Sequence, residues 1–462
     1  MRSFLYDNLT TKDKVHQQAV GYFEAMPKAE KVVKLEDLTP VIELYHHLIG
    51  AGKFEDAYVL WRDRLWKVLF YQLSGYNLQN ELLLELFSKD NEEIINLKND
   101  SHKSKVFNEL ANSYSLSGQP AKAVPLFLRT IGFTERNKET RNLAIDLGNL
   151  AHMAQIPIGQ LSAAVVHLRK SIALFQEVQA EFDEAVEHKE LGRVLAYQHN
   201  ASGRAEEEFQ DAYNIDSKQN NLQALSLIFA YRSVSALLKT RVDVTQKSIL
   251  RYTLEQAHQA LEFAEKDAKT FSPVPRDFIR AYWLLGESLV QYKNQNAKIK
   301  KSFEIHFYDE HFQTITGTEL VQPDNELETA ARCLTEALRR CRKANLVDSE
   351  SDILLAWARL ERSRGSKGEM ERLKEYLKEA KEIAERAGYR LKLADIHLFC
   401  GEVLLKKPGE KLLGITAKEH LHLAKEYAKD VSTFEDLYQS KDKHFYDGIT
   451  EYEMLKRGMT EQ

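Results

Sequence analysis

The feature that most constrains the fold is a pair of helical patterns separated by a short turn in residues 106–141. Gly118 ends the first pattern, because glycine adopts the left-handed conformation that many helix ends require. Pro120 follows where a second helix can begin without losing a needed hydrogen-bond donor. The second helix carries a small residue, a large apolar residue four positions later and a small residue three positions after that. In this unit the three residues are Ala123, Phe127 and Thr130.

This small–large–small pattern recurs along the chain and predicts a stack of helical hairpins. The large residues at 127, 168 and 209 are 41 residues apart, somewhat more than the roughly 34 residues of a minimal tetratricopeptide unit. One hairpin cannot bury both of its apolar faces, so each must pack on its neighbours. We therefore predict an all-α, right-handed superhelical solenoid of tetratricopeptide-like hairpins, about seven to nine in number. Further copies of the pattern are Ala164/Leu168/Ser171, Ala205/Phe209/Ala212, Ala330/Leu334/Ala337 and Ala417/Leu421/Ala424.

One segment departs from helical periodicity. Phe303, Ile305 and Phe307 alternate with polar residues, which is the period of a β-strand. We expect a small β-hairpin at 294–324, inserted between the two helices of one repeat, and both a binding role and a packing role remain open for it. The resulting division of the chain is 1–100 with a divergent repeat, 101–293 with regular repeats, the insertion 294–324, and 325–462 with further repeats and terminal helices.

Composition and motifs exclude several functions. The 462 residues carry a formal net charge of only -5, too small to indicate a nucleic-acid or membrane partner. The glycine-rich turn at 50–53 lacks the first glycine and the Ser or Thr of a phosphate loop. Neither HExxH nor CxxC occurs, and no nucleophile–base pair is apparent, so we expect no catalytic residue, no metal and no cofactor. Three cysteines without framework spacing, no secretory signal and no long apolar run lead us to expect a cytoplasmic protein.

The concave side of the predicted solenoid is the candidate partner-binding surface. First helices line this side, and asparagine amides there can bind a peptide backbone through donor and acceptor together. Arginines can bind carboxylates or phosphates, so capture of an acidic segment is open. A protein or peptide is the expected partner, and a nucleic acid or nucleotide-like signal on a basic stripe is the alternative. The stripe would comprise Lys189, Arg193, Arg232, Arg280 and Arg359. The full set of candidate residues is Asn108, Asn112, Asn149, His152, Lys189, Arg193, Arg232, Arg280, Trp283, Arg359 and Asp395.

Several segments together resemble one family. They are YHHLIGAGKFEDAYVLWRDRL (45–65), ELANSYSLSGQPAKAVPLF (109–127), NLAIDLGNLAHMAQIPIGQLSAAVVHLRKSI (142–172), DILLAWARLERSRG (352–365) and GYRLKLADIHLF (388–399). In this order they resemble the C-terminal tetratricopeptide sensor region of bacterial STAND NTPases of the NACHT or NB-ARC type. The resemblance implies a non-enzymatic module that recognises a trigger, such as a phage protein or a separately encoded effector. The chain departs from the family by lacking a phosphate loop and an effector domain, so nucleotide-driven activation does not transfer to it.

Overall fold

The computed structural model describes residues 12–26, 32, 34–88, 94–197, 202–242, 247–271, 273–295, 297, 299, 302–310, 312, 314–366, 368–405, 407 and 409–431. Most of them are helical, which confirms the predicted fold class, and one two-stranded sheet interrupts the helices. The terminal helices expected beyond residue 431 lie outside the described residues. None of the described helices combines the length and apolarity that crossing a membrane requires.

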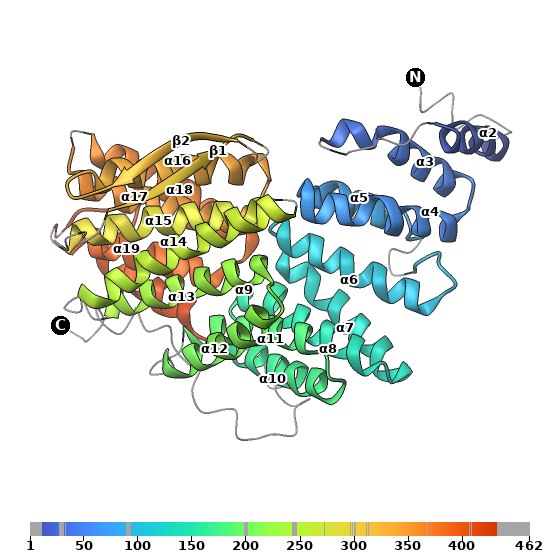
Figure 1. Cartoon of the computed structure of the whole chain (residues 1–462), viewed down its shortest axis with the longest axis horizontal. Helices are drawn as coiled ribbons and strands as arrows, with labels where there is room; N and C mark the ends of the chain where they lie inside the picture. Colours follow the sequence, from blue (N-terminus) through green and yellow to red (C-terminus); the bar gives the residue numbers. More distant parts are fainter. Residues whose placement is uncertain are drawn as a thin grey trace.

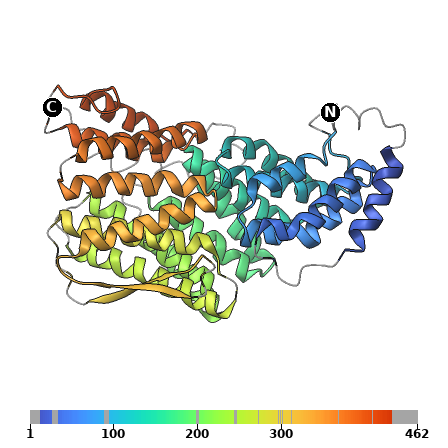
Figure 2. The same cartoon turned by 90° about the horizontal axis from the view of Figure 1, so that it is seen from above.

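The N-terminal helices lie at one end of the long axis and the later hairpins at the other, as Figures 1 and 2 both show. Two π-helical turns interrupt this region, so its helices are short. Trp61 and Tyr45 are completely buried in its core. The elements are α2 (Lys12–Glu24), η1 (Leu35–Leu38), α3 (Thr39–Gly50), α4 (Phe54–Leu60), η2 (Trp61–Leu65), η3 (Val68–Gln72) and α5 (Tyr76–Leu84).

Seven consecutive helical hairpins follow within the described residues from 100 to 428. We call the N-terminal member of each hairpin the first helix. The first helices are α6 (Asp100–Leu116), α8 (Thr140–Asn149) with its continuation through η4 (Leu150–Gln155) and α9 (Ile156–Ile158), α11 (Glu181–Leu195), α13 (Leu222–Val242), α15 (Pro275–Asn294), α17 (Val347–Arg364) and α19 (Arg390–Leu404).

The second helix of each hairpin packs antiparallel on the first. As predicted, Gly118 lies in the turn before α7 with φ +83°, and Pro120 starts α7. The second helices are α7 (Pro120–Asn137), α10 (Leu161–Glu177), α12 (Ser202–Lys218), α14 (Lys247–Thr270), α16 (Glu326–Lys343), α18 (Glu369–Ala387) and α20 (Ala417–Ala428).

The small–large–small pattern marks the contact between the two helices of a hairpin. Phe127, Leu168, Phe209 and Leu334 each have 0% of their surface exposed. The prediction that they lie between helices is confirmed. Because these residues come from second helices, the core of the solenoid runs along the whole stack between the two helical layers.

The predicted hairpin is present between α15 and α16. Strands β1 (Phe303–Tyr308) and β2 (Ile315–Val321) pair antiparallel, with Phe303 opposite Val321. Its apolar side is buried: the ring of Phe307 stacks on Tyr282 of α15 with centroids 5.3 Å apart. The hydroxyl of Tyr282 donates a hydrogen bond to the carbonyl of His306. The sheet is therefore an integral outer layer on α15 and α16.

The C-terminal end of the solenoid folds back onto its middle. The side chain of Asp430 accepts hydrogen bonds from the backbone amides of Leu161 and Ser162 at the start of α10. The amide of Val431 donates to the carbonyl of Gly159, 3.0 Å away. These contacts, about 270 residues apart in sequence, close the stack of hairpins around a central space.

Candidate functional site

The inner faces of the first helices enclose a cavity of about 1020 Å³, which we call the central cavity. All seven first helices contribute side chains to its lining, and α12, α14, α16 and α18 contribute none. Most first helices present residues three or four positions apart, as expected for one helical face. The cavity is thus the concave side of the solenoid, narrowed by the return of its C-terminal end.

Most of the predicted partner-binding residues line the central cavity. Trp283 brings an indole ring to the wall, and Arg193 a guanidinium group. The lining members of the predicted set are Asn108, Asn112, Asn149, His152, Arg193, Arg280, Trp283 and Asp395.

Lys189, Arg232 and Arg359 do not line the cavity, and their placement corrects the prediction. Each is held by a carboxylate between helices: Lys189 Nζ lies 2.7 Å from Asp216 of α12. Arg232 is 2.7 Å from Glu206 of α12, and Arg359 is 3.0 Å from Glu287 of α15.

The physical reason is the register of the helices. In α11 the inward face carries Glu187, Glu190 and Arg193, while Lys189 is rotated away from it toward α12. Arg232 is the neighbour of the inward-facing Tyr231 and is rotated by about 100°. Sequence reasoning also missed Glu187 and Glu190, although their spacing from Arg193 fits the same helical face.

A network of amides occupies the part of the cavity formed by α6 and α8. The amide of Asn108 donates to Asp146, 2.8 Å away, and its carbonyl accepts from Asn112 and Asn149. His152 lies 3.2 Å from the side-chain oxygen of Asn149. The side-chain oxygen of Asn112 is buried and has no hydrogen-bond partner, so the network ends in an acceptor without a donor.

A second network joins α11 to α13 and η4. Glu190 forms an ion pair of 2.7 Å with Arg193 and accepts a hydrogen bond of 2.8 Å from the hydroxyl of Tyr231. Burial would raise the pKa of Glu190, but Arg193 brings it below its ordinary value. Burial lowers the pKa of His152 to about 4, so its imidazole is neutral at pH 7.

The lining of the cavity is predominantly acidic. Eleven carboxylates and six cationic side chains face it, so the carboxylates are in excess by five and the formal charge of the lining is -5. This equals the formal net charge of -5 of the whole chain. Burial raises the pKa of Asp146 to about 6, which still leaves it mostly ionised at pH 7. The carboxylates belong to Glu109, Glu139, Asp146, Asp183, Glu187, Glu190, Asp277, Glu287, Asp348, Asp352 and Asp395.

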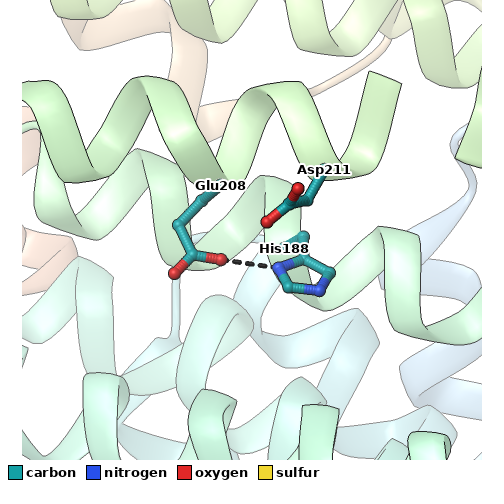
Figure 3. A group of neighbouring side chains, drawn as sticks. All are labelled: His188, Glu208 and Asp211. Atoms are coloured by element: carbon teal, nitrogen blue, oxygen red, sulfur yellow. Dashed lines mark hydrogen bonds and ion pairs between the residues drawn. The ribbon is translucent and has the colours of Figure 1, made fainter. Parts of the chain in front are cut away.

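Away from the cavity, one group of side chains in the described part of the chain has the geometry of a metal site. One ligand atom each from His188 of α11 and Glu208 and Asp211 of α12 lie within 4.8 Å of one another (Figure 3). His188 Nδ1 is 2.5 Å from Glu208. Burial opposes a charge on His188, but its hydrogen bond to the carboxylate of Glu208 raises its pKa overall. The group is a hydrogen-bonded contact between a histidine of α11 and carboxylates of α12. Because its members come from two helices, no spacing within one helix identifies it in the sequence.

The three cysteines are buried, and their surroundings disfavour the reactive thiolate form. Burial raises the pKa of the thiols of Cys333, Cys341 and Cys400. A nucleophilic cysteine needs the opposite shift, since the thiolate is the reactive form. The central cavity is therefore the feature of the described chain best suited to a ligand.

Comparisons with known proteins leave the function open. No family model matches the sequence, and no curated protein is similar enough to match. Among solved structures, yeast Tom70 is 14% identical, over 92% of this chain and 91% of that chain, with a TM-score of 0.32. A circular tandem repeat protein with novel repeat topology is 11% identical, over 92% of this chain and 98% of that chain, with a TM-score of 0.25. Neither value is high enough to transfer a ligand to this chain.

Proposed function

We propose that the protein is a non-enzymatic recognition module that binds a peptide segment of a protein partner in its central cavity. The observation that carries the proposal is the lining itself. Asparagines, aromatic rings and carboxylates from seven helices converge on one space of about 1020 Å³. Ligand sites are concave, largely apolar, and carry a few converging polar groups.

The alternative of a nucleic acid on a basic stripe is not favoured. Every member of the stripe has a carboxylate partner, as shown for Arg280 with Asp277 at 3.2 Å and Arg193 with Glu190 at 2.7 Å. Affinity for phosphates depends on cations that can neutralise them. A cavity with an excess of carboxylates repels a polyanion, so a peptide is the better ligand.

Catalysis is also not favoured. Glu187 and Glu190 are two carboxylates with pKa values displaced in opposite directions, an arrangement that some acid–base catalysts share. However, Glu190 is occupied by Arg193 and Tyr231, so it is not available to act as a base.

Selection of peptides tests the proposal. A display library of random peptides is selected on the wild-type chain, and the recovered peptides are measured by fluorescence anisotropy against two variants. Ile145 lines the cavity and is half-buried, so Ile145→Trp fills part of the space. Val178 follows α10 outside the cavity and is 39% exposed, which makes Val178→Trp the matched control.

We expect Ile145→Trp to lower peptide affinity at least about tenfold, because about 1.4 kcal/mol of lost contact gives that factor. Val178→Trp should bind like wild type. Recovery of no peptide, or of peptides that bind all three chains equally, contradicts a site in the cavity.

The resemblance to STAND sensor regions supports a finer proposal: the chain works in the bacterial cytoplasm and binds a phage protein or a separately encoded effector. Affinity capture from cells with and without phage infection tests it. We expect a phage or effector protein on the wild-type chain and on Val178→Trp, but not on Ile145→Trp. Capture of the same proteins by all three chains would contradict this role.

A further inference from the structure

We propose that Glu187 is the anchor for a cationic group of the ligand, an ammonium or guanidinium such as that of a lysine or arginine side chain. The inference rests on the proposed function and names the chemistry that the cavity selects.

Glu187 is a buried carboxylate without a partner. Only 4% of the residue is exposed, yet it lines the central cavity. Its Oε2 has no hydrogen-bond donor, and among the described residues no cation forms an ion pair with it. A buried carboxylate without compensation is costly. Burial, with the nearby carboxylate of Glu190, raises the pKa of Glu187 well above its ordinary value, and a cation bound beside it would favour the charged form.

The sequence context shows that a carboxylate is unusual at this position. Glu187 stands four residues before the leucine of the Leu191–Gly192 pair. The corresponding positions in α6, α8 and α15 are apolar: Val106, Leu143 and Ala281. Packing of the first helices therefore does not require an acid here.

The structure also makes room for this carboxylate. Gly148 of α8 lies against it, and a Cβ atom at Gly148 would overlap Oε1 of Glu187. Glycine thus leaves the carboxylate a buried place at the wall between α8 and α11.

One turn beyond Glu187 in α11, Glu190 already has its cation in Arg193. Of these two acids, only Glu187 has no ion-pair partner among the described residues. The charge of Lys189 acts on Glu187, but Lys189 is paired with Asp216.

The rest of the lining fits the same ligand class. Five of the six lining cations have a carboxylate partner, and the sixth, Arg276, lies over the ring of Phe70 near Asp277 and Asp348. A further anion would find no unpaired cation except Arg276.

The indole ring of Trp283 at the wall can attract a cation through its face. Arg193 and Arg280, in contrast, already lie over the ring of Tyr231. These features favour a basic segment over an acidic one as the ligand.

A double-mutant cycle tests the anchor. The probes are peptides recovered in the selection above, and each lysine or arginine in them is replaced in turn by norleucine or citrulline. The protein variants are Glu187→Gln and, as a control, Glu181→Gln, which removes the same charge from an exposed position on the same helix. We expect one basic residue whose replacement lowers affinity about 30-fold for wild type and Glu181→Gln, but under about threefold for Glu187→Gln.

Spermidine, which carries the same ammonium chemistry without a peptide, forms the second arm. One outcome is that spermidine raises the thermal midpoint of wild type but not of Glu187→Gln, while the selection recovers no peptide. This outcome would support the anchor and overturn the peptide function. Cavity-binding peptides without a basic residue, or basic peptides whose affinity is unchanged in Glu187→Gln, would overturn the anchor and leave the function standing. If the protein binds neither a peptide nor spermidine, both the anchor and the peptide function are overturned.

Discussion

A Cβ atom placed on Gly192 of α11 would lie 2.5 Å from a ring carbon of Phe209 in α12. The same relationship holds for Gly286 with Leu334 and for Gly401 with Leu421, at 2.7 and 2.6 Å. In each case the absence of a side chain on the glycine of a first helix leaves room for the large residue of the following second helix. The close approach of the two helices depends on this complementarity.

Gly192→Ala is therefore expected to destabilise the protein by about 1–3 kcal/mol, since an added carbon in a packed contact forces neighbours to shift. Gly132 of α7 provides the control, because nothing lies within 4 Å of a Cβ atom there. Gly132→Ala should stabilise the helix by about 0.5–1 kcal/mol. Urea denaturation measures both changes, and equal effects at the two glycines would contradict this account of the packing.

Much of the fold could be predicted from this pattern, because the spacing of small and large residues directly reflects helix–helix contact. The β-hairpin was predictable as well, since the alternation of Phe303, Ile305 and Phe307 survives in the sequence. The closure of the solenoid could not be predicted from the sequence. The hydrogen bonds that join Asp430 and Val431 to residues near 160 depend on the summed curvature of all hairpins.

The candidate site was predictable only in part. The inner face of α8 continues through the π-helical turn η4, which changes the rotation of later residues relative to a regular helix. In α11 the sequence does not reveal which of the successive charged residues Glu187, Lys189 and Glu190 face inward. Asp216, which holds Lys189 away from the cavity, comes from another helix.

The buried pair of Lys189 and Asp216 should be structural. The two side chains are 2% and 0% exposed. Lys189→Met leaves the carboxylate of Asp216 buried without its cation and is expected to cost about 3–5 kcal/mol. Adding Asp216→Leu should recover most of that loss, because an apolar pair can replace a buried ion pair. A cost below about 1 kcal/mol for the single change would show that the pair is not structural.

The histidine pair at the C-terminal hairpin should make stability depend on pH. His420 donates from Nε2 to the carbonyl of Leu412, so its neutral Nδ1 accepts from Nδ1 of His397, 2.8 Å away. Burial, with the neighbouring His420 and Lys381, lowers the pKa of His397 to about 4. The ordinary value is about 6.5.

Between these two pKa values the unfolded chain binds a proton that the folded chain excludes, so the free energy of unfolding falls as pH falls from about 6.5 to about 4. The loss between pH 7.5 and pH 5 should be about 2 kcal/mol from His397. Denaturation at both pH values, compared with His397→Gln, isolates this contribution. An unchanged pH dependence in the variant would exclude His397 as its source.

The β-hairpin should contribute to stability and not to the central cavity. No residue of β1 or β2 lines the cavity, while Ile305 and Val321 are 0% exposed against the helices. Replacing the hairpin by a short linker should lower the thermal midpoint and leave peptide affinity within about twofold. Loss of affinity with an unchanged midpoint would instead assign the hairpin a role in recognition.

Hydrogen exchange with a selected peptide tests the central claim most directly. Mass spectrometry on the full chain, with and without saturating peptide, measures which backbone amides the ligand protects. We predict protection of the first helices α8, α11 and α15, which supply Asn149, Glu187 and Trp283 to the cavity. The second helices α12, α14, α16 and α18 should exchange as in the free protein. Protection confined to those second helices or to the β-hairpin would contradict binding in the central cavity.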